Sequence, residues 1–224
     1  MYVSEAVKSR FSCRAFTEKP VSKELIKEIL DVAKQAPSGG NLQPWHIHVI
    51  SGKKLDQIVS DIESKITDMP MGEKTEYDVY PPNLWEPYRS RRFKCGEDLY
   101  KSINIPREDK GARLKQLAKN LRFFGAPVGL FVYIDRKMGP PQWSDVGMFL
   151  QTVMLIAREK GLHSCAQEAW AMWHSTVKQH LVVDDNLMLF CGMGIGYADE
   201  NHPINSWRTE REAVDYFTTF YGFE

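Results

Sequence analysis

The stretch QWSDVGMFLQTVMLIAREKGL (residues 142–162) is the most continuously apolar helical segment of the chain. Apolar side chains lie nearly all round a helix through residues 143–160, so we predict that this helix is central and buried. Gly161 follows it and predicts its end, because glycine readily adopts the left-handed conformation that closes helices. The apolar stretches 128–134 and 187–195 on either side are predicted to be buried strands.

The rest of the chain supplies shorter elements around this centre. Ser22 is a predicted N-cap, and the helix after it should end before Pro37, because a residue that precedes proline is disfavoured in a helix. Residues 47–50 and 163–169 are predicted to be short extended segments. Further helices are expected at about 2–10, 55–66 and 106–121, and from about Ser175. Helices outnumber strands and interleave with them, which indicates an α+β or α/β class.

Length and charge exclude several classes of protein. The chain has 224 residues, which predicts a single domain spanning 1–224. Its 29 basic and 29 acidic residues balance, so there is no overall electrostatic case for binding nucleic acid or an anionic membrane. The longest apolar stretches are well short of the ~18 residues that a membrane helix needs.

The cysteines and the first residues indicate where the protein works. Its four cysteines are scattered and form no CxxC pair, which fits a reducing compartment better than a disulfide framework. The opening MYVSEAVKSR mixes acidic and basic residues and has no apolar core, so we do not expect a signal peptide. These features predict a cytoplasmic protein.

Two segments depart from the regular pattern. Residues 68–106 hold five prolines and several aromatic residues, and we interpret them as an irregular excursion that contains one helix. Residues 198–224 are first polar and then aromatic. We expect this tail to pack on something larger than itself, such as another subunit.

Arginines near both ends of the chain are candidate anion ligands. Arg10 and Arg14 are four residues apart with Ser12 between them, a combination that suits a phosphate because arginine offers paired donors and keeps its charge. Arg208 and Arg211 form a second pair. Taken alone, each pair is more simply explained as solvated surface charge.

Two polar segments suit the edge of a heterocyclic ligand. The loop APSGGNLQPW (36–45) offers backbone N–H groups and neutral amides between two prolines. CAQEAW (165–170) follows a predicted strand, and its small residues would let a ligand approach the backbone. An ordinary loop and an ordinary strand end explain them about equally well.

Other motifs carry less weight. The glycines of GMGIG (192–196) lie inside a predicted strand with no helix after them, so we discard a dinucleotide motif. The six histidines have no metal-ligand spacing, and no metal site is expected. Cys165 is a weak candidate nucleophile. The basic cluster at 89–94 is a solvated face or steers a carboxylated substrate.

Taken together, these segments resemble the flavin-dependent nitroreductase family nearly end to end. The resemblance is carried by SRFSCRAF (9–16), APSGGNLQPW (36–45), FFGAPVGLFVYIDR (123–136), QWSDVGMFLQTVMLIAREKGL (142–162), CAQEAWA (165–171) and RTEREAVDYFTTFYGF (208–223). Residues 79–95 and 165–171 look like the subgroup that acts on nitrobenzene, nitrobenzoate and related compounds. The sequence departs from the common pattern at Ala166 and Ala169, where many members have proline and glycine.

The resemblance implies an α+β sandwich, with a mostly antiparallel central sheet flanked by helices, built as an intertwined homodimer that binds two FMN molecules. The tail at 198–224 would embrace the other subunit. Arg10, Arg208 and Arg211 would hold the FMN phosphate, with Ser12 near the ribityl chain and Arg14 near the pyrimidine ring. The implied cofactor contacts are Arg10, Ser12, Arg14, Pro37, Ser38, Gly39, Asn41, Gln43, Gln167, Glu168, Ala169, Arg208 and Arg211.

The roles of two of these groups follow from the family. The loop residues 37–43 would reach the flavin from the partner subunit, and the backbone at 167–169 would lie against flavin N5 and O4. No side chain would act as a catalytic nucleophile, because flavin N5 carries the hydride. Phe123, Phe124, Tyr80 and Trp85 are candidate walls of a substrate pocket, although ordinary core packing is favoured for at least one of the two phenylalanines.

The implied activity is an NAD(P)H-dependent, ping-pong reduction of nitroaromatic compounds to hydroxylamines, with NADH or NADPH as co-substrate. Other flavin activities remain open: reduction of quinones or activated alkenes, dehalogenation, or an oxygenase reaction that cleaves the flavin. A third possibility is a protein that binds FMN without turnover. The aromatic excursion at 68–106 favours a substrate pocket over storage.

Overall fold

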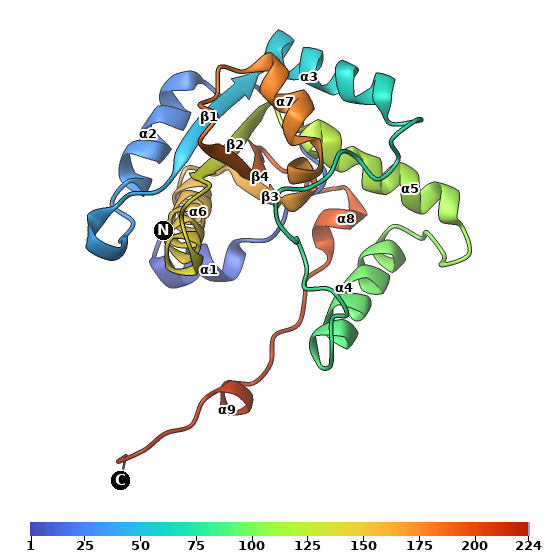
Figure 1. The fold of residues 1–224 in the computed structure, drawn as a ribbon. Helices are drawn as coiled ribbons and strands as arrows, with labels where there is room; N and C mark the ends of the chain where they lie inside the picture. Colours follow the sequence, from blue (N-terminus) through green and yellow to red (C-terminus); the bar gives the residue numbers. More distant parts are fainter. Residues whose placement is uncertain (224) are drawn as a thin grey trace.

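Four antiparallel strands form the sheet at the centre of the molecule, in the order β1-β2-β4-β3 (Figure 1). The computed structural model describes residues 1–223. The strands are β1 (His46–Ser51), β2 (Val128–Asp135), β3 (His163–Gln167) and β4 (Leu187–Gly196). The predicted strands at 47–50, 128–134 and 187–195 are confirmed, and so is the predicted antiparallel α+β architecture.

Helices cover both faces of this sheet. They are α1 (Val3–Ser9), α2 (Lys23–Ala33), α3 (Gly52–Lys65), α4 (Tyr88–Ser102), α5 (Lys110–Ala118), α6 (Pro140–Glu159), α7 (His174–His180), α8 (Pro203–Ser206) and α9 (Val214–Phe217). Three short 3-10 turns connect them: η1 (Gly39–Asn41), η2 (Lys119–Gly125) and η3 (Glu168–Trp173). The predicted N-cap of α2 is confirmed, since Ser22 Oγ accepts a hydrogen bond of 3.1 Å from the Leu25 amide.

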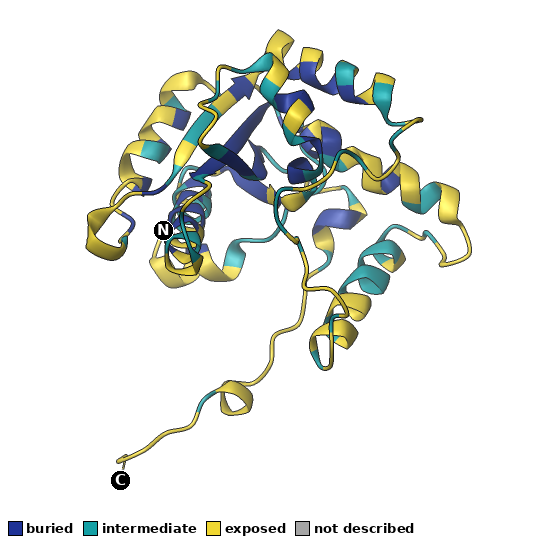
Figure 2. Cartoon of the chain, in the orientation of Figure 1, coloured by how far each residue is buried: buried dark blue, intermediate teal, exposed yellow. Residues whose placement is uncertain are grey.

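The alternation of side chains along β2 builds two hydrophobic clusters. Leu130 and Val132 join the cluster that contains α2 and α6, whereas Phe131 and Tyr133 join the cluster that contains α3 and α7. Successive side chains of a strand point to opposite faces, so the centre of the sheet is buried on both sides. Figure 2 shows the inner strands dark and buried, whereas the edge strand β1 is largely exposed or half-buried.

The helix α6 differs from its prediction in one respect. It buries one face, which carries Val146, Phe149 and Val153, but Met148 is 39% exposed on the other side. In a single subunit, therefore, some of the apolar residues around α6 remain exposed to solvent. Its end is as predicted, with Gly161 at a φ of +75°.

The helix expected from Pro106 is also corrected. It begins at Lys110, because the side chain of Asp109 accepts a hydrogen bond from the Ala112 amide at 2.8 Å and caps it there. Leu114 and Leu117 of its predicted core face are exposed, and Gln116 is buried instead. The apolar residues of α5 do share one helix face, but in a single subunit this face is exposed to solvent.

The glycines of β4 have a packing function. A Cβ at Gly192 would lie 2.3 Å from Cδ1 of Trp170, and one at Gly196 would lie 2.6 Å from Cδ of Pro127. Glycine is needed here so that the aromatic cluster and the chain before β2 can reach the sheet. These residues lie inside a strand, in agreement with the rejection of a dinucleotide motif.

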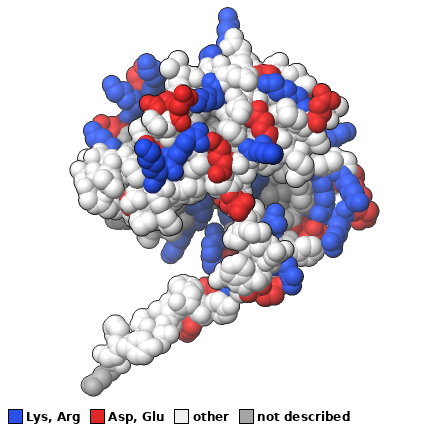
Figure 3. All heavy atoms as spheres, viewed as in Figure 1, with Lys and Arg blue, Asp and Glu red and all other residues white. Residues whose placement is uncertain are grey.

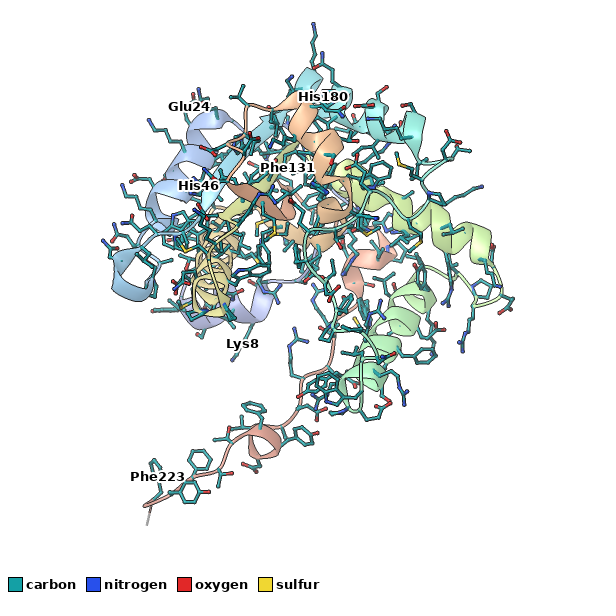
Figure 4. The ribbon with its side chains drawn as sticks, viewed as in Figure 1. Lys8, Glu24, His46, Phe131, His180 and Phe223 are labelled. Atoms are coloured by element: carbon teal, nitrogen blue, oxygen red, sulfur yellow. The ribbon has the colours of Figure 1, made fainter. Side chains whose placement is uncertain are left out.

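The excursion and the tail lie on one side of this body. Residues 68–106 contain one helix, α4, as predicted. The tail runs away from the body, and Phe223 near its end points into open space (Figure 4). Phe217, Phe220 and Tyr221 are likewise exposed. Within residues 1–223, none of the helices has the length and apolar character needed to cross a membrane.

Candidate functional site

The predicted phosphate segment runs beside the edge strand β3. Ser12 pairs with Ser164, and the Cys13 amide donates a hydrogen bond of 3.0 Å to the Ser164 carbonyl. Because alternate side chains of an extended chain point in opposite directions, the buried Cys13 turns Ser12 and Arg14 to the other side. Arg10, Ser12 and Arg14 all line one cavity of about 480 Å³.

The start of the tail forms another wall of this cavity. Arg208, Thr209 and Arg211 line it together with the N-terminal arginines. The two arginine pairs, which are about 200 positions apart in the sequence, thus meet at one place. Figure 3 shows basic side chains around the recess between the body of the molecule and the segment that carries α4 and the tail.

Asn205 fastens the two chain segments to each other. Its Oδ1 accepts a hydrogen bond of 2.9 Å from the Arg14 amide, while its Nδ2 donates to the carbonyls of Ala15 and Asp199 at 2.7 and 2.8 Å. The residue is 4% exposed, so each bond lies in a largely water-free setting. Sequence reasoning missed Asn205, because one asparagine in a polar tail follows no recognisable pattern.

The cavity has an excess of positive charge. None of the guanidinium groups of Arg10, Arg14, Arg208 and Arg211 is paired with a carboxylate among residues 1–223. Burial lowers the pKa of Arg10, and the neighbouring charge of Arg211 lowers it further. Arg208 lies over the ring of Phe11, 3.9 Å from its centroid. Like charges held together without counter-ions favour an anionic ligand.

His163 and Cys165 lie behind these arginines. Burial, with the charges of Arg158 and Arg208, lowers the pKa of His163 to about 4, so its imidazole is neutral at pH 7. Burial raises the pKa of Cys165 to about 11. A buried thiol that stays protonated is a poor nucleophile, so the structure does not support the nucleophile hypothesis for Cys165.

The three predicted cofactor contacts at the end of β3 differ in how far they are buried. The side chain of Gln167 is buried and its Nε2 donates to the carbonyl of Asn120 at 2.8 Å, so it points into the protein and leaves only its backbone for a ligand. Glu168 is exposed, yet the protein atoms around its carboxyl raise its pKa. Ala169 is half-buried. Asn120, which sequence reasoning did not single out, ties η2 to this strand end.

The polar loop at 36–45 does not line the arginine cavity of its own chain. Pro37, Gly39, Asn41 and Gln43 are exposed, and Ser38 is half-buried. The loop is nevertheless well defined: the Gly39 amide donates to Asp145 Oδ2 at 3.2 Å, and the Gln43 amide donates to Ser38 Oγ at 3.0 Å. One chain thus brings the arginines together but leaves this loop apart from them.

A second cavity of about 680 Å³ adjoins the first, and Arg14 and Cys95 line both. Tyr80 and Phe124, two of the four candidate pocket walls, line it. Phe123 does not, because its ring is fully buried and stacks on Trp170 with 4.4 Å between centroids. Trp85 is also absent from this cavity and packs edge-on against Tyr88. Phe123 and Trp85 thus do not line this cavity of the single chain.

The chain matches the model of a known family over most of its length. The nitroreductase family model matches residues 7–197. The chain belongs to the nitroreductase family. Within this family it is 42% identical to a 4-nitrobenzoate reductase from Pseudomonas putida over 218 residues, which is 97% of this chain and 95% of the relative. It is 35% identical to a nitrobenzene nitroreductase from Ectopseudomonas oleovorans, over 98% of this chain and 96% of that protein.

A solved structure of the nitroreductase family has nearly the same fold. The crystal structure of the FMN and NADPH-dependent nitroreductase NfnB from Sphigopyxis sp. strain HMH matches all of this chain and all of its own, with 46% identity and a TM-score of 0.96. This agreement extends through the excursion and the tail.

Proposed function

We propose that this protein is an FMN-dependent nitroreductase that uses NAD(P)H to reduce nitroaromatic compounds to hydroxylamines. The observation that carries the proposal is the cavity in which four guanidinium groups converge without a carboxylate, in a chain 46% identical to an FMN and NADPH-dependent nitroreductase. Each nitro group would consume two NAD(P)H and two protons, and would release one water.

The donors of this cavity fit FMN. Arg10, Arg208 and Arg211 would hold the phosphate, since guanidinium forks match its oxygens, and Ser12 would face the ribityl chain. Arg14 would lie near the pyrimidine ring and stabilise negative charge there. When bound, FMN supplies the two-electron chemistry, and the protein supplies binding, orientation and electrostatics.

The remaining predicted contacts need a second subunit or the backbone. We propose that Pro37, Ser38, Gly39, Asn41 and Gln43 reach the cofactor of a partner subunit in a homodimer. The exposed loop supports this, and so do the exposed aromatic residues of the tail and the exposed Leu114 and Leu117 of α5. The backbone at Gln167, Glu168 and Ala169 would face the flavin ring from the subunit that supplies the arginines.

We propose a ping-pong order of binding and a cytoplasmic location. The cavity of about 680 Å³ beside the arginines has room for NAD(P)H and then, after NAD(P)+ leaves, for the nitroaromatic acceptor. All four cysteines are free, three of them buried, which suits a reducing compartment. Residues 1–224 would function as one domain of this dimer.

The visible spectrum of the purified protein tests the function. We expect a flavin absorption band that bleaches when NADH or NADPH is added without air, and that returns when nitrobenzene is added. A band that neither coenzyme bleaches would instead indicate a protein that binds FMN without turnover. A colourless protein that FMN cannot reconstitute would contradict the proposal as a whole.

A further inference from the structure

The second cavity has the size and walls of a pocket for an aromatic molecule. Its volume of about 680 Å³ lies within the range of small-molecule sites. Tyr80, Phe93, Tyr100, Leu117 and Phe124 line it and provide apolar and aromatic surface. These residues come from the excursion, from α4 and from the segment α5–η2, so the pocket lies between elements that are separate in the sequence.

Two of the four charged groups that line the pocket are already neutralised. Arg89 pairs with Glu86 at 2.8 Å. Glu97 receives two hydrogen bonds from Arg113, of 2.7 and 3.0 Å. Arg14 and Arg92 remain, and neither has a carboxylate partner in the part of the chain that the structure describes. Since the proposed function assigns Arg14 to the cofactor, Arg92 is the pocket's one charged group without a role.

The guanidinium of Arg92 is held in place by an aromatic ring. It lies over Tyr80, with 4.2 Å from its central carbon to the ring centroid. Stacking on the ring leaves the edge of the guanidinium, with its N–H donors, open to a ligand. A planar fork of this kind matches the two oxygens of a carboxylate.

A neutral donor also faces the pocket. Gln116 lines it and is 7% exposed, yet its side-chain amide has no hydrogen-bond partner among residues 1–223. Among residues 1–223 the amide of Gln116 is not one of the fully buried polar atoms that lack a partner, so it remains open to the cavity. A polar ligand in the pocket can therefore accept a hydrogen bond from it.

We propose that this cavity binds the acceptor and that Arg92 selects nitroaromatic compounds that carry a carboxylate. The ring of the acceptor packs among the aromatic walls, the carboxylate accepts hydrogen bonds from Arg92, and Gln116 bonds to an oxygen of the acceptor. This inference rests on the proposed function and adds to it a residue that distinguishes acceptors with a carboxylate from those without one. Arg92 acts in binding and holds no reacting atom.

The test compares two acceptors that differ in charge. We would measure kcat/KM of the FMN-loaded protein for 4-nitrobenzoate and for nitrobenzene, in the wild type and in Arg92→Gln. We expect kcat/KM for 4-nitrobenzoate to fall about ten- to a hundredfold, mainly through KM, because a charge-assisted hydrogen bond is lost. The value for nitrobenzene should stay within about twofold. Arg92→Lys should recover part of the loss, since it keeps the charge without the fork.

A matched control and a binding measurement separate charge from fold. Lys101→Gln removes a positive charge from the same helix at an exposed position outside the pocket, so the ratio of the two acceptors should not change. Benzoate, which has no nitro group to reduce, should perturb the spectrum of the oxidised wild-type protein. Its Kd should rise in Arg92→Gln and not in Lys101→Gln, with benzamide as the neutral comparison.

Three results would overturn the inference. If Arg92→Gln lowers kcat/KM for both acceptors equally, Arg92 acts on the coenzyme or the flavin, and a raised KM for NADPH would identify the coenzyme. If nitrobenzene is reduced but benzoate does not bind the wild type, the pocket has no carboxylate site and the proposed function still stands. If neither acceptor is reduced, both proposals fail.

Discussion

The backbone amide of Arg14 donates a hydrogen bond to the side chain of Asn205 across 2.9 Å, joining residues 191 positions apart. This bond fixes the tail against the N-terminal segment and so places Arg208 and Arg211 opposite Arg10. The proposed cofactor site therefore depends on a residue that is not itself among the predicted ligands.

Replacing Asn205 should weaken both the fold and cofactor binding. In Asn205→Ala, one buried amide and two carbonyls lose their partner, at a cost of about 1–3 kcal/mol of unfolding free energy. We expect a lower Tm and a raised Kd for FMN, measured by thermal melts and flavin titration. Ser206→Ala, which loses a single local bond at the surface, is the matched control and should melt close to the wild type. Equal melting of both variants would contradict the anchoring role.

Removing Arg211 should affect binding of the phosphate alone. We expect Arg211→Ala to raise the Kd for FMN at least about tenfold, since a charge-assisted contact is worth about 1.5–3 kcal/mol. Binding of riboflavin, which has no phosphate, should change little, and titration of the apoprotein with each compound measures the difference. The exposed Arg107, which lies over Phe93, provides the control Arg107→Ala. Equal losses for FMN and riboflavin would place Arg211 elsewhere in the site.

A side chain at Gly192 should disrupt the aromatic cluster. The added Cβ would lie 2.3 Å from Cδ1 of Trp170 and 3.0 Å from Cε1 of Phe123, so the core must shift. Overpacking of this kind costs about 1–3 kcal/mol, and we expect a clearly lower Tm for Gly192→Ala. Gly111→Ala on α5 meets its neighbour at an ordinary 3.7 Å and should keep or raise the Tm. A Gly192→Ala variant as stable as the wild type would refute this packing argument.

His163 should make stability depend on pH. Its pKa of about 4 in the folded protein is below the ordinary 6.5, so the unfolded chain binds a proton first as the pH falls. Stability is then greatest above pH 6.5 and decreases between about 6.5 and 4, by about 3 kcal/mol at most. Melting wild type and His163→Gln side by side across this range measures the effect. The wild type should lose more stability than the variant; parallel curves would show that other groups dominate.

The tail should control the oligomeric state. Phe217, Phe220 and Tyr221 are 60% or more exposed in one chain, and a partner subunit would bury them. We expect the triple substitution to serine to shift the protein from dimer to monomer and to release FMN, as measured by light scattering and by the flavin content of the monomer peak. Substituting Thr218 and Thr219 with serine is the control. A triple variant that stays dimeric and yellow would show that the tail is dispensable.

The local elements of this protein were largely predictable from the sequence. Apolar runs predicted β2 and β4 because a strand buried on both faces needs no polar positions. Ser22 and Gly161 predicted helix ends through local hydrogen bonding and backbone freedom. The apolar face of α5 and the apolar residues around α6 were both predicted to be buried, yet some of them are exposed. Periodicity shows that a helix face is apolar but does not show which element covers it.

The sequence by itself determined the sheet strands, most helices, the neutral charge balance and the motifs that resemble the nitroreductase family. Only the tertiary structure decided which candidates meet. It joined Arg10 and Arg14 to Arg208 and Arg211 through Asn205, buried Phe123 under Trp170, and placed Arg92 over Tyr80 in the wall of the second cavity. The physical reason is that secondary structure follows from local periodicity and capping, whereas a site is made by contacts between residues far apart in the chain.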